Sequence, residues 1–401
     1  MRRSDTNIWN DVGVHSDKEI VVVIDPGHGG LEGGADDGAG YNELTERFIN
    51  MQTAGAMYDE LSQYDNVRVY LTHADADVRM SLRERAEYAK SVGADYLISL
   101  HYNASESHIF YGSEVWIPSA GSYYVEGYKL ADAVLKEFQT MGLKTRGIKT
   151  RVGDDGEEYY GIIRESEKLG INAVIIEHCH IDNNHDGKYF DSEEDFIHFG
   201  KADATAVAKY LGLSGSRLSV DYSTYENVEV KEPEGRVYQD TTPPERCNVA
   251  LTENVKGNGN LEISIEATDN ESEIGYYSYS LDGGSSYSDL FAWDDSNADD
   301  KMDIIIQNVN RNEAALVVRV YNQYNLHTES GILTISGINN GTGERMNGNA
   351  DNSALVETEG FNGKKVWYND KVRLGLGIFL IITGICVMAI LMKKVRARKR
   401  L

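Results

Sequence analysis

Residues 20–30 read IVVVIDPGHGG, and this stretch decides the fold of the first half of the chain. Five consecutive β-branched residues predict a strand that is buried on both faces, as strands of parallel sheets are. The Pro-Gly and Gly-Gly pairs that follow predict a sharp turn. The turn places His28 at the carboxyl end of the strand, where open α/β sheets collect their functional groups.

The rest of residues 20–213 alternates between strand and helix patterns. Further strands are predicted at 67–71, 96–100, 113–117 and 173–177, and helices at 44–64, 82–92, 122–141 and 191–213. Ser81 and Glu84 have the spacing of a capping box, which opens the second of these helices. The alternation predicts an α/β domain with a mostly parallel sheet flanked by helices.

The character of the chain changes at residue 214. Residues 214–246 are polar, contain three of the five prolines, and predict a linker or an extended packing segment. Short alternating strands such as 261–265 and 315–320 predict a small all-β sandwich over residues 247–338. Residues 339–373 are rich in Gly, Asn and acidic residues, which is typical of a flexible stalk.

Residues 374–392 contain no charge, and residues 393–401 carry six basic groups. At about 1.5 Å per residue this segment is long enough to cross a bilayer core. It predicts a transmembrane helix, a basic cytoplasmic tail, and a single-pass protein of the cell membrane whose α/β domain is extracellular. Two alternatives remain: a buried helix of a soluble domain, or, because residues 1–19 lack an apolar stretch, a tail-anchored protein facing the cytoplasm.

The composition excludes some classes of partner. The chain has 39 Lys and Arg against 64 Asp and Glu, a formal net charge of −25 at pH 7. Such an acidic protein repels a phosphate backbone, so no nucleic acid partner is expected. Its three cysteines, Cys179, Cys247 and Cys386, are far apart and form neither a disulfide framework nor a Cys-x-x-Cys zinc signature.

Four ionisable side chains are predicted to meet at one edge of the sheet. His28 and His101 follow strands, Glu177 ends a strand, and Glu43 precedes the first helix. Each alone has an ordinary structural explanation, such as a surface histidine or a carboxylate at a helix N-terminus. Glu177 is the hardest to explain in this way, because an isolated buried carboxylate is costly. Together the four side chains predict a catalytic site rather than four unrelated structural groups.

Two neutral imidazoles and one carboxylate match the ligand set of a catalytic zinc site with an open position. His28, Glu43 and His101 are therefore the predicted zinc (Zn2+) ligands. Zinc acidifies a bound water and polarises a carbonyl group. Glu177 is then the predicted catalytic base, which accepts the water proton and returns it to the leaving amine. The spacing does not force this division of roles between Glu43 and Glu177, so the reverse remains open.

Further polar residues surround the predicted site. Asn103 and Arg146 are candidate substrate-binding residues. If the third predicted strand of the site continues beyond Glu177, alternation places His178 and His180 on the face opposite Glu177. These two histidines are expected to support the site or the substrate rather than to bind a second metal.

Five motifs around these residues follow one another in a characteristic order: VIDPGHGG at 23–30, NE at 42–43, SLHYNA at 99–104, RGIK at 146–149, and Glu177 followed by IDN at 181–183. They resemble the zinc-dependent N-acetylmuramoyl-L-alanine amidases of the type 3 family, which are bacterial cell-wall hydrolases. The resemblance covers about residues 20–212. It implies that His28, Glu43 and His101 bind zinc and that Glu177 is the catalytic glutamate. The implied substrate is peptidoglycan, cleaved at the amide between N-acetylmuramic acid and L-alanine.

The β-domain has its own resemblance. The sequences ATDN at 267–270 and YSLDGG at 279–284 resemble immunoglobulin-like repeats of bacterial surface proteins, which implies a spacer more than a wall-binding module. Two alternatives to the amidase function remain open. One is a zinc hydrolase of another amide, and the other is a non-catalytic surface binding protein on the same fold.

Overall fold

The computed structural model describes residues 19–30, 38–41, 44–253, 255–293 and 300–338, and the backbone of the short strand β19 (Val356–Glu357). Glu43, most of the predicted stalk, and the predicted transmembrane helix and basic tail lie outside the described residues. Within the described part of the chain, no helix is long and apolar enough to span a membrane.

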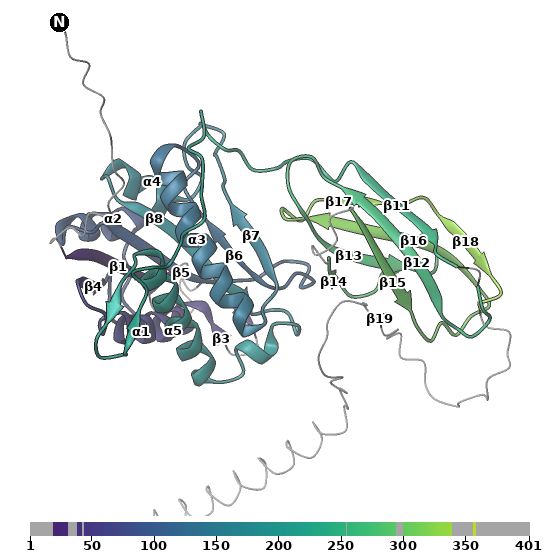
Figure 1. The fold of residues 1–401 in the computed structure, drawn as a ribbon, viewed down its shortest axis with the longest axis horizontal. Helices are drawn as coiled ribbons and strands as arrows, with labels where there is room; N and C mark the ends of the chain where they lie inside the picture. Colours follow the sequence, from purple (N-terminus) through teal and green to yellow (C-terminus); the bar gives the residue numbers. More distant parts are fainter. Residues whose placement is uncertain are drawn as a thin grey trace, which may run out of the picture. The chain divides into compact units, whose positions relative to one another are not determined.

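A six-stranded sheet forms the centre of the first domain (Figure 1). Its strands, in spatial order, are β4 (Val67–Leu71), β1 (Ile20–Pro26), β5 (Tyr96–Asn103), β8 (Asn172–His180), β6 (Ser113–Trp116) and β7 (Thr145–Lys149). All neighbouring pairs are parallel except β6 and β8, which are antiparallel. The prediction of a mostly parallel sheet flanked by helices is confirmed.

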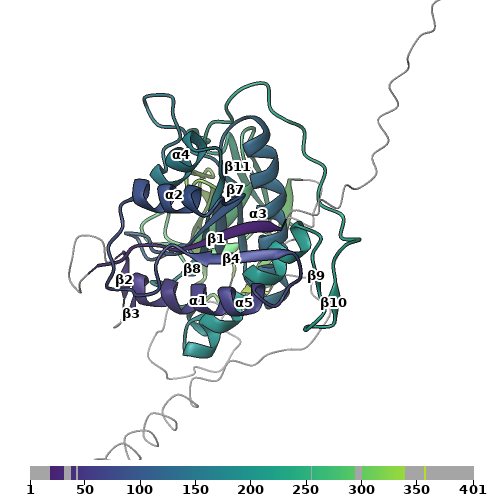
Figure 2. The ribbon, with the colours of Figure 1, turned by 90° about the vertical axis from the view of Figure 1, so that its left-hand side faces the viewer.

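Helices cover both faces of this sheet, as Figure 2 shows. One face carries α1 (Glu46–Leu61), α3 (Gly121–Met141) and α5 (Glu193–Tyr210), and the other carries α2 (Leu82–Ser91) and α4 (Gly161–Lys168). The predicted capping box is present, since the Ser81 hydroxyl accepts from Glu84 N and Glu84 accepts from Ser81 N. Three short elements complete the domain: β2 (Gly40–Tyr41), β3 (Leu44–Thr45) and the 3-10 turn Gly187–Tyr189.

The apolar run of β1 is uninterrupted because its side chains enter two cores. Val22 and Ile24 pack with α1, α3 and α5, whereas Val23 packs with α2 and α4. Because side chains alternate along a strand, Asp25 lies on the same side of the sheet as Val23. Asp25 is buried and precedes the turn to His28. The buried carboxylate of Asp25 therefore lies on the α2–α4 side of the sheet.

Residues 214–246 pack along the α/β domain instead of hanging free. They contain the two-residue strands β9 (Ser214–Gly215) and β10 (Val220–Asp221) and are otherwise irregular. Val237 N donates to Ser119 O at 2.7 Å, and the Thr150 hydroxyl donates to Val237 O at 2.7 Å. Of the two interpretations open from the sequence, these bonds favour the extended packing segment.

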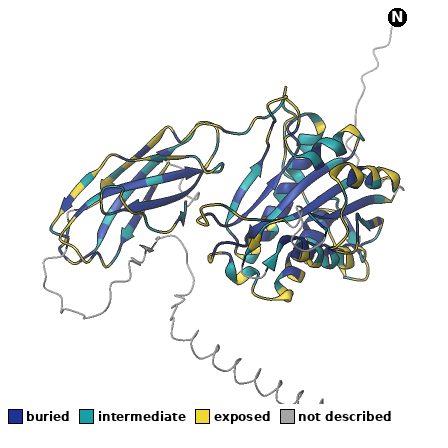
Figure 3. Ribbon diagram, turned by 180° about the vertical axis from the view of Figure 1, so that it is seen from behind, coloured by how far each residue is buried: buried dark blue, intermediate teal, exposed yellow. Residues whose placement is uncertain are grey.

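Residues 246–336, together with β19, form two antiparallel sheets around one core (Figures 1 and 3). The first sheet has the order β11 (Arg246–Leu251), β12 (Leu261–Thr268), β15 (Lys301–Ile306), β19; the second has the order β14 (Phe291–Ala292), β13 (Ile274–Ser280), β16 (Glu313–Asn322), β17 (His327–Glu329), with β18 (Leu333–Ser336) also paired to β16. Strand β12 alternates buried and half-buried residues along its whole length. Its inward side chains meet those of β16, as the sandwich prediction requires.

The α/β domain and this β-domain belong to one compact unit, which ends at Val356. An aromatic cluster joins them: Phe110 and Tyr111 pack with Tyr276, Leu290 and Tyr321. The Tyr276 hydroxyl also donates to the Tyr111 carbonyl. The contact between the domains is therefore a packed and hydrogen-bonded interface.

Candidate metal centre and active site

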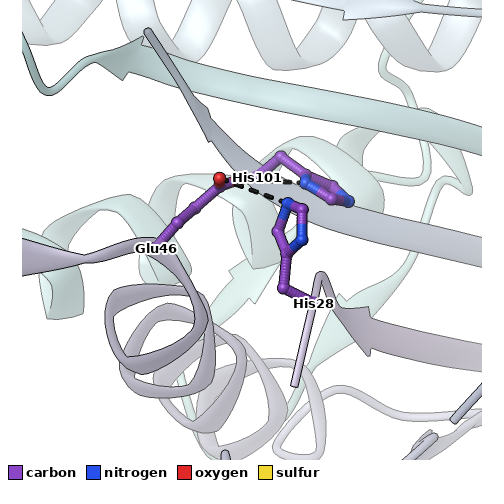
Figure 4. Close-up of side chains that lie close together, drawn as sticks. All are labelled: His28, Glu46 and His101. Carbon is purple, nitrogen blue, oxygen red and sulfur yellow. Dashed lines mark hydrogen bonds and ion pairs between the residues drawn. The ribbon is translucent and has the colours of Figure 1, made fainter. Parts of the chain in front are cut away.

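Two histidines and one carboxylate converge at the carboxyl ends of β1 and β5: His28 follows β1, and His101 is near the end of β5 (Figure 4). His28 Nε2 lies 3.2 Å from one oxygen of Glu46, and His101 Nδ1 lies 3.0 Å from the other. The donor atoms of the three residues all lie within 4.8 Å of one another. Two imidazole nitrogens and a carboxylate at such distances form a possible binding site for a divalent metal ion.

The turn that carries His28 is held by a buried arginine. Arg85 of α2 donates to Asp25 Oδ1 at 2.6 Å, to Pro26 O at 2.7 Å, and to His28 O. His28 itself has a φ of 64°, a left-handed conformation that is unusual for a residue with a side chain. The three hydrogen bonds from Arg85 fix this conformation, in which the imidazole points to Glu46.

Glycine is required beside both histidines. A Cβ at Gly27 would lie 2.3 Å from His101 Cε1 and Nε2. A Cβ at Gly38 would lie 2.5 Å from Glu46 Oε2 and 2.7 Å from His28 Cδ2. Gly27 and Gly38 therefore leave room for the side chains of His28, Glu46 and His101.

Glu46 begins helix α1 and is nearly buried. One of its oxygens accepts from Tyr102 N at 3.1 Å and the other from Ala39 N at 2.7 Å. Burial alone would raise the pKa of this carboxyl, but hydrogen bonds from His101 and His28, together with the charges of these two imidazoles, hold the pKa well below its usual value. Glu46 is therefore ionised, as a metal ligand must be.

Glu46 was missed by the sequence analysis, which assigned Glu43 as the carboxylate ligand. Glu43 lies outside the described residues, so that assignment stays a prediction. A signal for Glu46 was present, because Glu46, Asn50 and Thr53 have the spacing of one helix face and all three are buried. Asn50 donates to Gly27 O at 3.0 Å, so this polar face of α1 rests on the histidine turn.

Glu177 reaches the same edge from β8. Strand pairing sets it opposite His101 on one side and opposite Glu114 of β6 on the other. Paired residues of neighbouring strands share a face, so the three side chains stand in a row on the α2–α4 side. Glu177 thus lies one strand away from the metal-binding group.

The Glu177 carboxyl is poised for proton transfer. Its Oε2 atom is buried and has no hydrogen-bond partner among the described residues. Burial raises its pKa well above the usual value, and the negative charges of Glu46 and Glu114 raise it further. Such a carboxyl gains from accepting a proton, which is the property of a general base that later acts as an acid.

The prediction that His178 and His180 share the face opposite Glu177 is wrong for His180. His101 pairs with Glu177 but Asn103 pairs with His180, so β8 contains one extra residue there. This bulge shifts the alternation and turns His180 to the cavity that Glu177 lines. His178 does face away, with Nδ1 2.8 Å from His101 O and Nε2 2.8 Å from Asp203.

The candidate substrate residues Asn103 and Arg146 meet at Glu114. Asn103 donates to Glu114 Oε1 at 3.0 Å, and Arg146 Nε donates to Glu114 Oε2 at 2.7 Å. Lys149 donates to the same Oε2 atom at 2.6 Å. Arg146 is buried, so its guanidinium is engaged by protein groups although it lines the cavity.

Two cavities adjoin the row of site residues. One of about 950 Å³ is lined by His28, His101 and residues of α2 and α4. Another of about 510 Å³ is lined by Glu177, Asn103 and Arg146. Cavities of this size hold small ligands or segments of polymers. A substrate bound across the row would place its reacting bond between the histidines and Glu177.

Residues 22–209 match the family model described as N-acetylmuramoyl-L-alanine amidase. The α/β domain is an N-acetylmuramoyl-L-alanine amidase domain. The match begins in β1 and ends in α5, so it covers the sheet except the first two residues of β1, and every side chain of the site described above.

Curated relatives share this domain. The chain is 29% identical over 201 residues to the N-acetylmuramoyl-L-alanine amidase CwlM of Bacillus licheniformis, covering 49% of this chain and 70% of the relative. It is 28% identical over 195 residues to the endolysin of Bacillus phage SPP1, covering 48% of this chain and 66% of the endolysin. These alignments span about half of the present chain.

Among solved structures, the catalytic domain of the amidase CwlV from Bacillus (Paenibacillus) polymyxa var. colistinus is 28% identical, with a TM-score of 0.40. The alignment covers 48% of this chain and 98% of that domain.

Proposed function

We propose that this protein hydrolyses the amide between N-acetylmuramic acid and L-alanine in peptidoglycan, with the help of a bound zinc ion. One observation carries the proposal. In a domain of the amidase family, His28, Glu46 and His101 bring their donor atoms within 4.8 Å of one another, and Glu177 stands in register with His101.

The donor set fits zinc. Neutral imidazoles from His28 and His101 and the ionised carboxylate of Glu46 are the ligands of a three-residue catalytic zinc site. When bound there, zinc supplies an acidified water and a polarised carbonyl. This assigns the carboxylate ligand to Glu46, and Glu43 becomes the matched residue against which the assignment is tested.

The chain's own residues supply the proton transfers. Glu177 accepts the proton of the attacking water at its unpaired Oε2 atom. It then delivers this proton to the amide nitrogen, which leaves as the free amine of L-alanine. Arg85 and Gly27 hold the histidine turn in place during the reaction, because they fix the backbone and leave room for the His101 ring.

The experiment is product analysis on purified peptidoglycan, with wild type and Glu177→Gln. The wild type is expected to release intact stem peptides with a new L-alanine amine, and Glu177→Gln to lower kcat by about 10²- to 10⁴-fold with zinc content retained. A different bond cleaved would favour the hydrolase of another amide. No cleavage by the wild type would favour the non-catalytic binding protein, and equal rates would contradict the role of Glu177.

We also propose that residues 374–392 anchor the enzyme in the cell membrane, with the amidase domain extracellular and the β-domain as an immunoglobulin-like spacer. The uncharged segment followed by six basic residues supports this proposal. Membrane fractionation tests it: the full chain is expected in the membrane fraction and a chain ending at residue 373 in the soluble fraction. The same distribution for both chains would contradict the anchor.

A further inference from the structure

The cavity on the Glu177 side has walls from three parts of the chain. Glu177 and its neighbours on the sheet belong to the amidase domain, but Thr241 belongs to the connecting segment 214–246 and the turn 324–326 belongs to the β-domain. We propose that this composite pocket binds the stem peptide of the substrate. The β-domain would then help select the substrate besides acting as a spacer. The inference rests on the proposed amidase function.

The turn 324–326 is fixed to the sheet by specific bonds. Asn325 accepts from Arg146 Nη2 at 2.7 Å, and the Tyr324 hydroxyl donates to Thr150 O at 3.3 Å. Arg146 in turn is paired with the buried Glu114. The same network that joins Asn103 to Glu114 therefore extends into the β-domain, and the turn is a built part of the pocket wall.

The connecting segment is held as firmly. The Gln239 side-chain amide accepts from Val152 N at 2.9 Å and donates to Val152 O at 3.2 Å, so it satisfies both backbone groups of this residue. Asp240 is buried and accepts from Asn322 of the β-domain at 2.8 Å. Thr241 follows directly and is exposed toward solvent. The segment thus bridges the two domains at the point where it lines the pocket.

The mechanism indicates which half of the substrate enters this pocket. Glu177 must reach the leaving nitrogen, and that nitrogen belongs to the peptide. Glu177 lines the composite pocket of about 510 Å³, whereas the described residues around the cavity of about 950 Å³ include His28 and His101 but not Glu177. The peptide therefore extends into the composite pocket, and the larger cavity is left for the glycan.

The lining suits a peptide chain. Thr241 offers a hydroxyl group to a peptide backbone. Asn103 and Asn325 are already bonded to Glu114 and Arg146, but each amide keeps a second N–H and a second oxygen lone pair for a ligand. Arg151 adds an exposed guanidinium, stacked 3.6 Å from the ring centre of Tyr159. A peptide ends in a carboxylate, and a guanidinium is the side chain that pairs with carboxylates most specifically.

The test introduces a bulky side chain into the pocket from each of the two parts outside the amidase domain, the connecting segment and the β-domain. Thr241→Trp and Leu326→Trp each add an indole to the lining. Thr224→Trp, in the same segment, and Ile332→Trp, at a β-domain residue that is 64% exposed, are the matched controls. For each full-length protein, kcat/KM is measured on N-acetylmuramoyl-L-alanine and on N-acetylmuramoyl-tetrapeptide, together with the thermal unfolding midpoint.

The wild type is expected to prefer the tetrapeptide. Both pocket variants should lower the ratio of kcat/KM values, tetrapeptide over alanine, at least tenfold with wild-type unfolding midpoints, and both controls should keep the ratio. An unaltered ratio in the pocket variants would overturn the inference while leaving the amidase proposal intact. A wild type inactive on both substrates would contradict the proposed function itself.

Discussion

At the scale of single residues, some members of the site are easier to predict from the sequence than others. His28 and His101 could be predicted because His101 directly follows one strand signal and His28 lies in the turn after another, and such residues meet at one sheet edge. Glu46 could not be separated from Glu43 by that argument, since both acids lie near the start of the same helix. Only the packing of α1 on the histidine turn shows that Glu46 faces His28 and His101.

The glycine beside His101 gives a prediction at this scale. Gly27→Ala would put a methyl group 2.3 Å from the imidazole, so the ring must move and the metal site must distort. Displacing a ligand in this way is expected to weaken zinc binding by about 10- to 100-fold, as losses of ligand support commonly do. Zinc affinity from competition with a chelating dye measures this change.

The control for Gly27→Ala is Gly55→Ala. Gly55 lies within helix α1, and a methyl group there meets no atom within 4 Å. The variant should bind zinc as the wild type does and unfold at a higher temperature, because alanine favours helix by about 1 kcal/mol over glycine. Equal zinc affinity in both variants would contradict the steric role of Gly27.

At the scale of elements, the pattern of apolar residues predicted five of the six strands of the central sheet and the four longer helices. It did not predict strand β7 or helix α4. Strand β7 reads TRGIK, with only one apolar residue, because its polar side chains are engaged by Glu114. Helix α4 has eight residues, too few for a periodic signal. The bulge in β8 was also missed, since strand alternation contains no information about an added residue.

Helix α4 yields a prediction about pH. Burial, and then the charge of Glu158, raise the pKa of Glu167 to about 7. A raised pKa in the folded state means that this group's contribution to stability is fully present below the unfolded pKa of about 4.3 and is lost as the pH rises through about 7. Because Glu167 is only partly buried, solvent screens its charge and reduces the energy below the full value of the shift. Glu167→Gln should therefore raise the free energy of unfolding by only about 1 kcal/mol at pH 8 and by little at pH 4.

Denaturant unfolding at the two pH values measures this effect. Glu165→Gln is the control, because it removes a carboxylate of the same helix that pairs with Lys168 at 3.1 Å. It should lose a little stability at pH 8 where Glu167→Gln gains it. A gain for Glu167→Gln of the same size at both pH values would show that the buried charge is not its cause.

At the scale of the whole molecule, the amidase domain and the β-domain belong to one compact unit. The sequence predicted both domains but not the contact between them, because Tyr276, Tyr321 and Asn325 look like ordinary residues of strands and turns. Their partners Phe110, Tyr111 and Arg146 are more than a hundred residues away in the chain. This contact is what places the β-domain at the Glu177 pocket.

The most direct test of the central claim is the zinc content of three purified proteins: the wild type, Glu46→Gln, and Glu43→Gln as the matched control. Inductively coupled plasma mass spectrometry after dialysis gives the ratio of zinc to protein. We expect about one zinc per chain in the wild type and in Glu43→Gln, and a loss of most of it in Glu46→Gln, together with amidase activity. Full zinc content in Glu46→Gln, or its loss in Glu43→Gln alone, would contradict the site described here.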